Sequence, residues 1–130
     1  MKSSYKDEDV IFLLKDVTGM VIPLPSEERE KLIQSGMHYS EMLPIEYIPS
    51  EKYMSIYFNS LEIFGQHMAD ALAILSEKIL KKRGENVVAI SLARAGTPIG
   101  ILLKRYIKWK YGLDILHYSV SIIRDRGIDT

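Results

Sequence analysis

The chain of 130 residues contains no cysteine. Disulfide bonds, thiolate metal ligands and reactions of a cysteine nucleophile are therefore excluded for these residues. Neither sign of charge is in excess, because 17 basic residues balance 17 acidic ones, so net charge favours neither nucleic acid nor an acidic membrane as partner. Apolar runs stay well short of the roughly 20 residues that cross a bilayer, and MKSSYKDEDV lacks the apolar segment of a secretory signal. We expect a cytoplasmic protein without a membrane partner.

The chain divides into two regions near Gly84. Hydrophobic residues make up 47% and charged residues 26%, which is ordinary for a globular protein with one core. Residues 1–84 hold a short apolar patch, a turn region and a long helical pattern. Residues 85–130 alternate between strand and helix patterns. We predict a largely helical N-terminal region followed by a strand–helix–strand unit.

The first fifty residues give short elements. Val10–Leu14 is apolar and favours a buried strand over a helical turn, although five residues do not decide between them. Two prolines in residues 23–25 predict an extended connector. A helix is expected to begin at Ser26 and to stop at Gly36. Met37–Pro49 lacks a steady period and reads as an ordered loop.

A long helix is predicted from Ser50 to Arg83. Ser50 can cap its start, Gly84 can take the left-handed position after its end, and Gly65 marks a bend or a split. Apolar residues recur three or four positions apart and are expected to form core: Met54, Tyr57, Leu61, Phe64, Met68, Leu72, Leu75 and Ile79.

Residues 86–123 predict two parallel strands joined by a helix. Asn86–Leu92 is a buried-type strand, and Thr97 or Pro98 opens a helix that runs to about Tyr111. Leu113–Ile123 is the second strand, which places four side chains on one face, those of Leu116, Tyr118, Val120 and Ile122. A strand–helix–strand unit of this length requires parallel pairing.

The segment Ser91–Gly100, SLARAGTPIG, is the best candidate for a ligand site. It lies where a strand ends and a helix begins, and helix N-termini offer unpaired N–H groups to anions. Gly96 would allow unusual backbone angles, Arg94 would supply a planar cation suited to phosphate, and Thr97 a hydroxyl. The alternative is a tight turn whose arginine merely faces solvent, and spacing alone leaves both open. The Walker and dinucleotide glycine patterns both fail here.

Four blocks in one order carry a family resemblance: DVIFLLK, LIQSGMHYSEMLP, SLARAGTPIG and HYSVSIIRDRGID. The third resembles the pyrophosphate-binding segment of type I phosphoribosyltransferases. Together the blocks resemble a bacterial family of tellurite-resistance stress operons, described both as phosphoribosyltransferase-like and as cysteine protease StiP. The resemblance implies an α/β fold, a partial phosphoribosyltransferase-like (Rossmann-like) parallel sheet with a helical N-terminal part.

The resemblance also implies site residues. Arg94, Ala95, Gly96 and Thr97 would form the pyrophosphate loop, with Mg²⁺ arriving on a phosphorylated ligand. Arg124 and Arg126 would lie where such enzymes often bring a mobile basic loop over the phosphates, although a solvated chain end is the simpler interpretation.

Two features depart from the family patterns. The acidic loop ending in Thr-Gly that grips the ribose phosphate does not follow the second strand, and DVTG at residues 16–19 comes too early and reads as a turn. The cysteine that the protease description needs is absent. Only two firm strands are visible, so we expect either a fragment or a sheet completed by self-association or by a partner. An inactive or incomplete phosphoribosyltransferase-like protein and a non-catalytic assembly module both remain open.

Other candidate residues have simpler structural interpretations. His38, His67 and His117 lack metal-ligand spacing, and His117 is expected to be a satisfied structural histidine. The polar cluster His38–Glu41 is expected to cap the next turn. Four cations surround Trp109 on the last helix, Lys104, Arg105, Lys108 and Lys110. A solvated helix face is favoured there over nucleic-acid binding.

Overall fold

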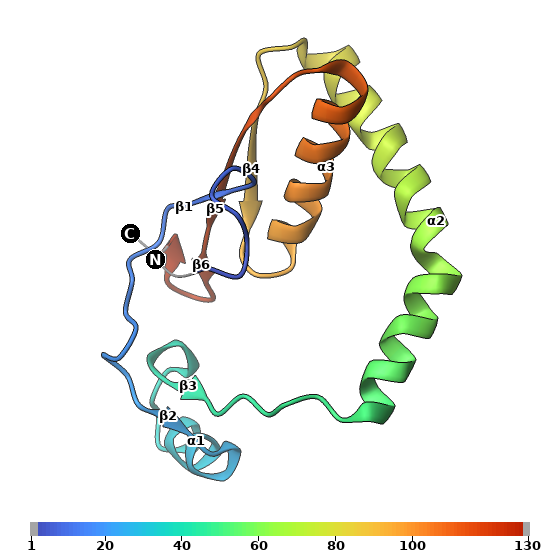
Figure 1. Cartoon of the computed structure of the whole chain (residues 1–130). Helices are drawn as coiled ribbons and strands as arrows, with labels where there is room; N and C mark the ends of the chain where they lie inside the picture. Colours follow the sequence, from blue (N-terminus) through green and yellow to red (C-terminus); the bar gives the residue numbers. More distant parts are fainter. Residues whose placement is uncertain (1–2, 129–130) are drawn as a thin grey trace. The chain divides into compact units, whose positions relative to one another are not determined.

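The computed structural model describes residues 3–128 and shows a mixed α/β protein with a small parallel sheet (Figure 1). Its helices are α1 (Ser26–Gln34), α2 (Glu51–Arg83) and α3 (Gly96–Tyr111), with a 3-10 turn at Tyr39–Glu41. Its strands are β1 (Ile11–Phe12), β2 (Pro23–Leu24), β3 (Leu43–Pro44), β4 (Val88–Leu92), β5 (Leu116–Val120), β6 (Ile122–Ile123) and β7 (Gly127–Ile128). No helix of the described part is long and apolar enough to cross a membrane.

Residues 16–56 form one compact unit. It holds α1 and a two-stranded parallel ladder, in which Pro23 of β2 pairs with Leu43 of β3. The predicted turn at residues 16–19 is confirmed, since the Thr18 N–H donates to Asp16 Oδ1 over 2.9 Å. The predicted cap is also present, because His38 accepts a hydrogen bond from the Ser40 N–H.

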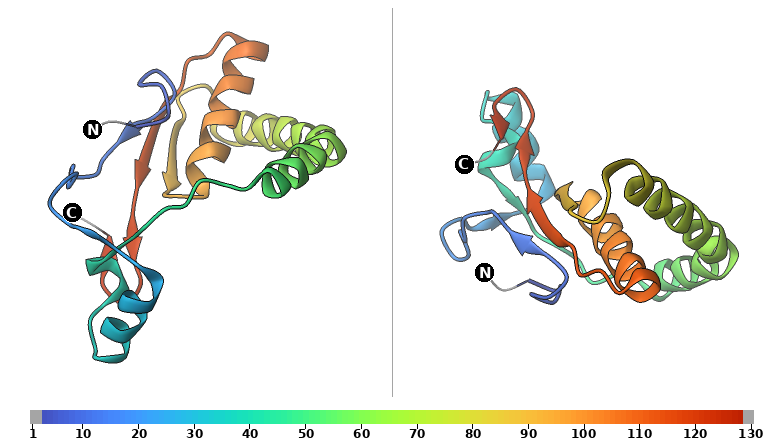
Figure 2. Two further views of the ribbon diagram at one scale, coloured as in Figure 1. Left: turned by 60° about the horizontal axis from the view of Figure 1, so that its bottom comes forward. Right: turned by 90° about the horizontal axis from the view of Figure 1, so that it is seen from above.

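The second unit runs to Lys15, resumes at Tyr57 and contains the three-stranded sheet, in the order β1-β5-β4. Both ladders are parallel, with Ile11 opposite Tyr118 and Ser91 opposite Ser119. This confirms a strand within Val10–Leu14 and the parallel strand–helix–strand unit. The predicted burial of these strands is wrong, because α3 covers only one face of the sheet: Ile11 is 43% exposed, and Val88, Ile90 and Leu92 are 51–69% exposed. Helix α3 covers one face of the sheet, and the C-terminal half of α2 lies on the outer side of α3 (Figure 2).

The predicted strand over residues 113–123 is shorter than expected. Gly112 ends α3 in the left-handed conformation (φ 70°), and the three residues after it connect to β5. Beyond Val120 the chain leaves the main sheet, and β6 pairs antiparallel with β7. Within β5 the expected alternation holds, because His117 and Ser119 are buried while Leu116 is exposed.

Helix α2 is continuous through Gly65, so the predicted bend or split does not occur. Its ends follow the sequence signals. The Tyr53 N–H donates to Ser50 Oγ over 3.2 Å at the start, and Gly84 has a positive φ of 78° after the end.

The apolar stripe of α2 does not form core as predicted. Five of its eight residues are exposed by 44–59%: Tyr57, Leu61, Phe64, Met68 and Leu75. The physical reason is that, within its own unit, the helix contacts α3 through its C-terminal half. There Tyr106 and Lys110 of α3 both donate hydrogen bonds to the Glu77 carboxylate, and Ser76 is buried.

Candidate functional site

The loop between β4 and α3 lies at the carboxyl end of the parallel sheet. Helix α3 begins at Gly96, one residue before the predicted start, and its N-cap residue Ala95 provides no side-chain cap. The Ala93 N–H donates to the Val120 carbonyl over 2.8 Å, which fixes the loop to β5. The Ala93–Arg94 peptide bond is cis. The loop therefore joins an anchored strand end to a helix N-terminus whose positive dipole end is not neutralised by a side chain.

Arg94 is the exposed cation of this loop. Within residues 3–128 its guanidinium takes part in no hydrogen bond or ion pair. Ala95 beside it is exposed as well. A free guanidinium next to main-chain N–H groups is chemically able to bind an oxyanion, because its planar donors match two oxygens at once.

Gly96 and Thr97 differ from the sequence-based expectation in detail. Gly96 has no positive φ, and a Cβ added there would lie 3.5 Å from Ser91 Cβ, an ordinary contact. Unusual backbone angles are thus not the reason for this glycine. Thr97 is 2% exposed, and its hydroxyl hydrogen-bonds Ser119 Oγ over 2.8 Å. The Thr97 N–H donates to the Arg94 carbonyl over 3.2 Å. Through the bond of its hydroxyl to Ser119, Thr97 holds the start of α3 on β5.

A buried polar chain lies directly beneath the loop. His117 is 1% exposed, with Nε2 2.9 Å from Ser91 Oγ and Nδ1 2.9 Å from the Asp9 carbonyl oxygen. A carbonyl only accepts, so Nδ1 carries a hydrogen and donates to Asp9. Nε2 shares a hydrogen bond with the Ser91 hydroxyl, which also lies 3.4 Å from the Tyr118 carbonyl oxygen. The prediction of a satisfied structural histidine is confirmed. The partners Ser91 and Asp9 were not predicted.

Sequence reasoning missed the packing role of Gly100. A Cβ at this position would lie 2.2 Å from His117 Nε2, so the imidazole occupies the space that a side chain would need. The spacing of Gly96 and Gly100 on one helix face was the available signal. It points to close packing of the helix on the strands rather than to phosphate.

The two other predicted basic residues lie in the β6–β7 hairpin. Arg124 and Arg126 occupy its turn, together with Asp125 at a φ of 64°. Because β5 runs parallel to β4, the hairpin follows β5 at the same end of the sheet as the β4–α3 loop (Figure 1). Both arginines are exposed side chains that make interactions of their own. Within residues 3–128 no hydrogen bond or ion pair joins them to Arg94.

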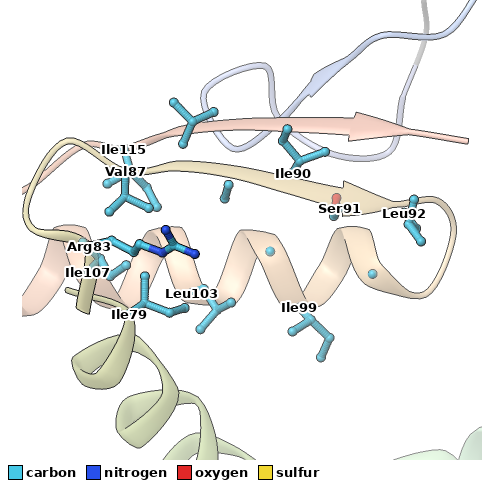
Figure 3. Close-up of a pocket in the computed structure, with 14 residues that line it drawn as sticks. Ile79, Arg83, Val87, Ile90, Ser91, Leu92, Ile99, Leu103, Ile107 and Ile115 are labelled. Atoms are coloured by element: carbon cyan, nitrogen blue, oxygen red, sulfur yellow. The ribbon is translucent and has the colours of Figure 1, made fainter. Parts of the chain in front are cut away.

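An apolar groove of about 590 Å³ runs along the outer edge of β4 and the side of α3 (Figure 3). One end lies at the beginning of α3, and the end of α2 closes the other. Most of its lining is aliphatic and includes Ile79, Val87, Ile99, Leu103 and Ile107, with Arg83 at the α2 end.

The four cations around Trp109 have acidic partners. Lys104 and Lys108 contact Asp114 at 3.3 and 2.9 Å, Arg105 pairs with Asp9, and Lys110 with Glu77. These pairs lower the pKa of the Asp114 and Glu77 carboxyl groups through hydrogen bonds from the lysines. Three carboxylates thus offset all but one of the four positive charges, because Lys104 and Lys108 share Asp114.

Comparison with known protein families shows to which family the chain belongs. A family model described as tellurite-like stress resistance cysteine protease StiP matches residues 3–130. The chain belongs to the StiP family. The resemblance seen in four sequence blocks is thereby confirmed, together with the association of the family with stress resistance.

One curated StiP relative is described as "Cysteine protease StiP" from Acinetobacter baylyi. It is 39% identical over 127 residues, which are 97% of this chain but 32% of the relative. The chain thus spans about a third of the length of the curated relative it matches. No solved structure matches the chain. The cysteine in the family description has no counterpart among these 130 residues.

Proposed function

We propose that this StiP-family chain binds the pyrophosphate group of a phosphorylated ligand through its β4–α3 loop. The carrying observation is the exposed Arg94 guanidinium, free of partners within residues 3–128, beside the uncapped start of α3. The resemblance to phosphoribosyltransferases makes phosphoribosyl pyrophosphate the ligand class. We include a phosphoribosyltransferase-like fold in the proposal, for which the parallel β4–α3–β5 unit is the support.

Each predicted residue has a defined part in this proposal. Arg94 and the N–H groups of Ala95 and Gly96 would stabilise negative charge on a bound or departing pyrophosphate. Thr97 would act indirectly, by holding the helix start on Ser119. Arg124 and Arg126 would add positive charge from the neighbouring strand end.

Mg²⁺ would arrive with the ligand and would not be held in a cage of protein carboxylates. Ser91–Gly100 contains no acidic residue. Within residues 3–128, no three histidine or acidic side chains are grouped in a way that would hold a metal ion. Mg²⁺ commonly binds substrate phosphates and keeps several waters, which suits such a site.

Amide hydrogen exchange with inorganic pyrophosphate, with and without Mg²⁺, tests the proposal. The amides of residues 94–97 should become protected on binding, because the ligand would engage or bury them. Arg94→Ala should weaken binding by about 10- to 100-fold, the usual loss for a charged hydrogen bond. Arg94→Lys should retain part of the affinity as a point charge.

The control is Lys81→Ala, which removes an exposed cation at the end of α2. It should bind pyrophosphate like the unmodified chain. Unchanged exchange at residues 94–97 with saturating pyrophosphate would overturn the proposal. If the Arg94→Ala and Lys81→Ala variants bind pyrophosphate with equal affinity, Arg94 does not take part in the binding.

A non-catalytic binding or assembly module is the second candidate. It is favoured by the coverage of 32% of the curated relative and by the exposed apolar stripe of α2. It differs from the first candidate in predicting no turnover of phosphoribosyl pyrophosphate, even where pyrophosphate binds. Release of pyrophosphate in the presence of the chain and a panel of nucleobases would contradict it.

A further inference from the structure

Strand β4 ends the sheet with a free edge. The Ala93 N–H bonds the Val120 carbonyl of β5, so the odd-numbered residues of β4 face β5 in the alternating pattern of a parallel ladder. The N–H and C=O groups of Val88, Ile90 and Leu92 therefore point away from β5. Within residues 3–128 no strand pairs with this edge.

The edge has none of the features that usually prevent strand pairing. Its sequence, VAISL, contains neither charge nor proline. Val88, Ile90 and Leu92 also expose 52%, 69% and 51% of their apolar side chains. Natural edges are commonly protected by lysine, proline or a bulge, and an unprotected apolar edge is a template for another strand.

The apolar groove lies beside this same edge, on the α3 side of the sheet (Figure 3). The β4 residues on that side are Ala89 and Ser91, which are too small to fill about 590 Å³. A neighbouring strand would place alternate side chains between β4 and α3. The aliphatic lining requires those side chains to be large and apolar.

The opposite face of the sheet continues the apolar surface. Leu116 of β5 is 50% exposed and Ile11 of β1 is 43% exposed there. Parallel sheets in α/β proteins are normally covered on both faces, whereas α3 covers one. A further strand would complete the free edge of β4, and a helix would cover the open face of the sheet.

We propose that the β4 edge, its groove and the open face bind the StiP polypeptide segment that this chain does not span. We choose this segment because of the length of the curated relative: nearly all of this chain matches it, but about two thirds of the relative lies outside the match. Such a segment would add a parallel strand with large apolar side chains to β4, and a helix to the open face. This association does not depend on pyrophosphate binding.

A second copy of the chain fits the edge less well. In a two-fold pairing of β4 with itself that keeps both α3 helices on one face, the strands would run antiparallel. Each copy would then offer Ala89 and Ser91 to the groove of the other, and these side chains are too small to fill it.

The experiment mixes the full 130-residue chain with the part of the Acinetobacter baylyi relative outside the matched 127 residues, made as a separate polypeptide. Light scattering should show a one-to-one complex. Hydrogen exchange should show new protection at the amides of Val88, Ile90 and Leu92. The amides of Ala89 and Ser91, already paired with β5, should change little.

Ile90→Lys places a charge at the centre of the edge and should weaken the complex at least tenfold. The matched control is Ile48→Lys, since Ile48 is 94% exposed and lies outside the sheet; it should bind normally. Absence of a complex, or edge amides that stay unprotected within one, would overturn the proposal. If the chain dimerises alone and the same amides become protected, the molecule that binds the edge is a second copy and not the StiP segment. Pyrophosphate protection of residues 94–97 is read separately, so the two proposals fail independently.

Discussion

Gly100 and His117 lie in contact beneath the β4–α3 loop, and the imidazole fills the space next to the glycine. The imidazole is 1% exposed, hydrogen-bonds both Ser91 and Asp9, and lies where a Cβ of residue 100 would lie. The ring has no room to rotate away without breaking one of its two hydrogen bonds. Position 100 therefore accepts only glycine without a rearrangement.

Gly100→Ala is predicted to destabilise the chain by about 1–3 kcal/mol, the usual range for overpacking. The control is Gly65→Ala in α2, where an added Cβ meets only Leu61 Cδ1 at 3.9 Å. That change should stabilise the chain by up to about 1 kcal/mol through helix propensity. Urea unfolding checks both variants, and a neutral Gly100→Ala would contradict the tight fit of His117.

For single residues, the sequence predicted where a side chain lies better than it predicted which partner that side chain contacts. Arg94 lies at the strand–helix junction as expected, because a strand pattern followed by proline and helix pattern is a local signal. The role of Thr97 depends on Ser119, a residue 22 positions away. The need for Gly100 depends on His117 in another strand, and such contacts have no local sequence signature.

Among the elements, the segment before β1 and helix α3 are joined by Asp9 and Arg105. The Asp9 carboxylate is 4% exposed and accepts hydrogen bonds from Arg105 Nε at 2.8 Å and Nη2 at 2.5 Å. The Arg105 hydrogen bond lowers the pKa of Asp9 below its ordinary value. The Asp9 carbonyl also accepts from His117, so one residue connects three elements.

Asp9→Asn is predicted to reduce stability most near neutral pH. A folded-state pKa below the unfolded value of about 3.9 means that the pair contributes fully above about pH 4 and is lost as pH falls through the folded pKa. The unfolding midpoint should drop by about 5 °C at pH 7, and the difference should shrink as the pH falls below about 4. Thermal unfolding from pH 7 to pH 3 measures this.

Asp7→Asn is the matched control, since Asp7 is exposed two positions earlier. It should leave the midpoint nearly unchanged at every pH. A deficit of Asp9→Asn that stays constant down to pH 3 would show that packing, and not the charge of Asp9, is responsible.

The ends of secondary-structure elements were predictable where residues next to them in sequence start or stop the element. Gly36, Gly84 and Gly112 all have the positive φ that their helix-ending positions require, and α2 begins within one residue of its Ser50 cap. The end of β5 at Val120 was not predictable. Ser121 and Ile122 continue the alternating pattern, and only the separate pairing of β6 with β7 divides them from the strand.

The whole molecule combines zero formal charge with extensive exposed apolar surface. Its sequence pI is about 6.8. The exposed groups include Ile90 on β4 and Phe64 on α2, at 69% and 59%. Without net charge there is little long-range repulsion to oppose apolar contact between molecules.

Self-association of the isolated chain should therefore be strongest near pH 6.8. Light scattering at equal protein concentration should show a larger mean mass at that pH than two units above or below it. Phe64→Lys should reduce the effect, because it adds a charge within the exposed apolar stripe of α2. A monomer at pH 6.8 and at high concentration would contradict the prediction.

Long-range arrangement was the part that sequence could not supply. The placement of β5 between β1 and β4 depends on pairing over about a hundred residues, from Ile11 to Tyr118. The stripe of α2 predicted a buried face because its period is helical. Periodicity shows that a face is apolar but does not identify what covers it.

The hydrogen bond of His117 to Ser91 beside Gly100 also has an evolutionary consequence. A relative that carries a larger residue at position 100 must carry a smaller one at position 117 or hold its helix farther from its strands, and the smaller residue would lose the hydrogen bond to Ser91. Positions 91, 100 and 117 should consequently vary together across the family. A relative with alanine at 100 that still retains histidine at 117 must have a wider separation between its helix and its strands.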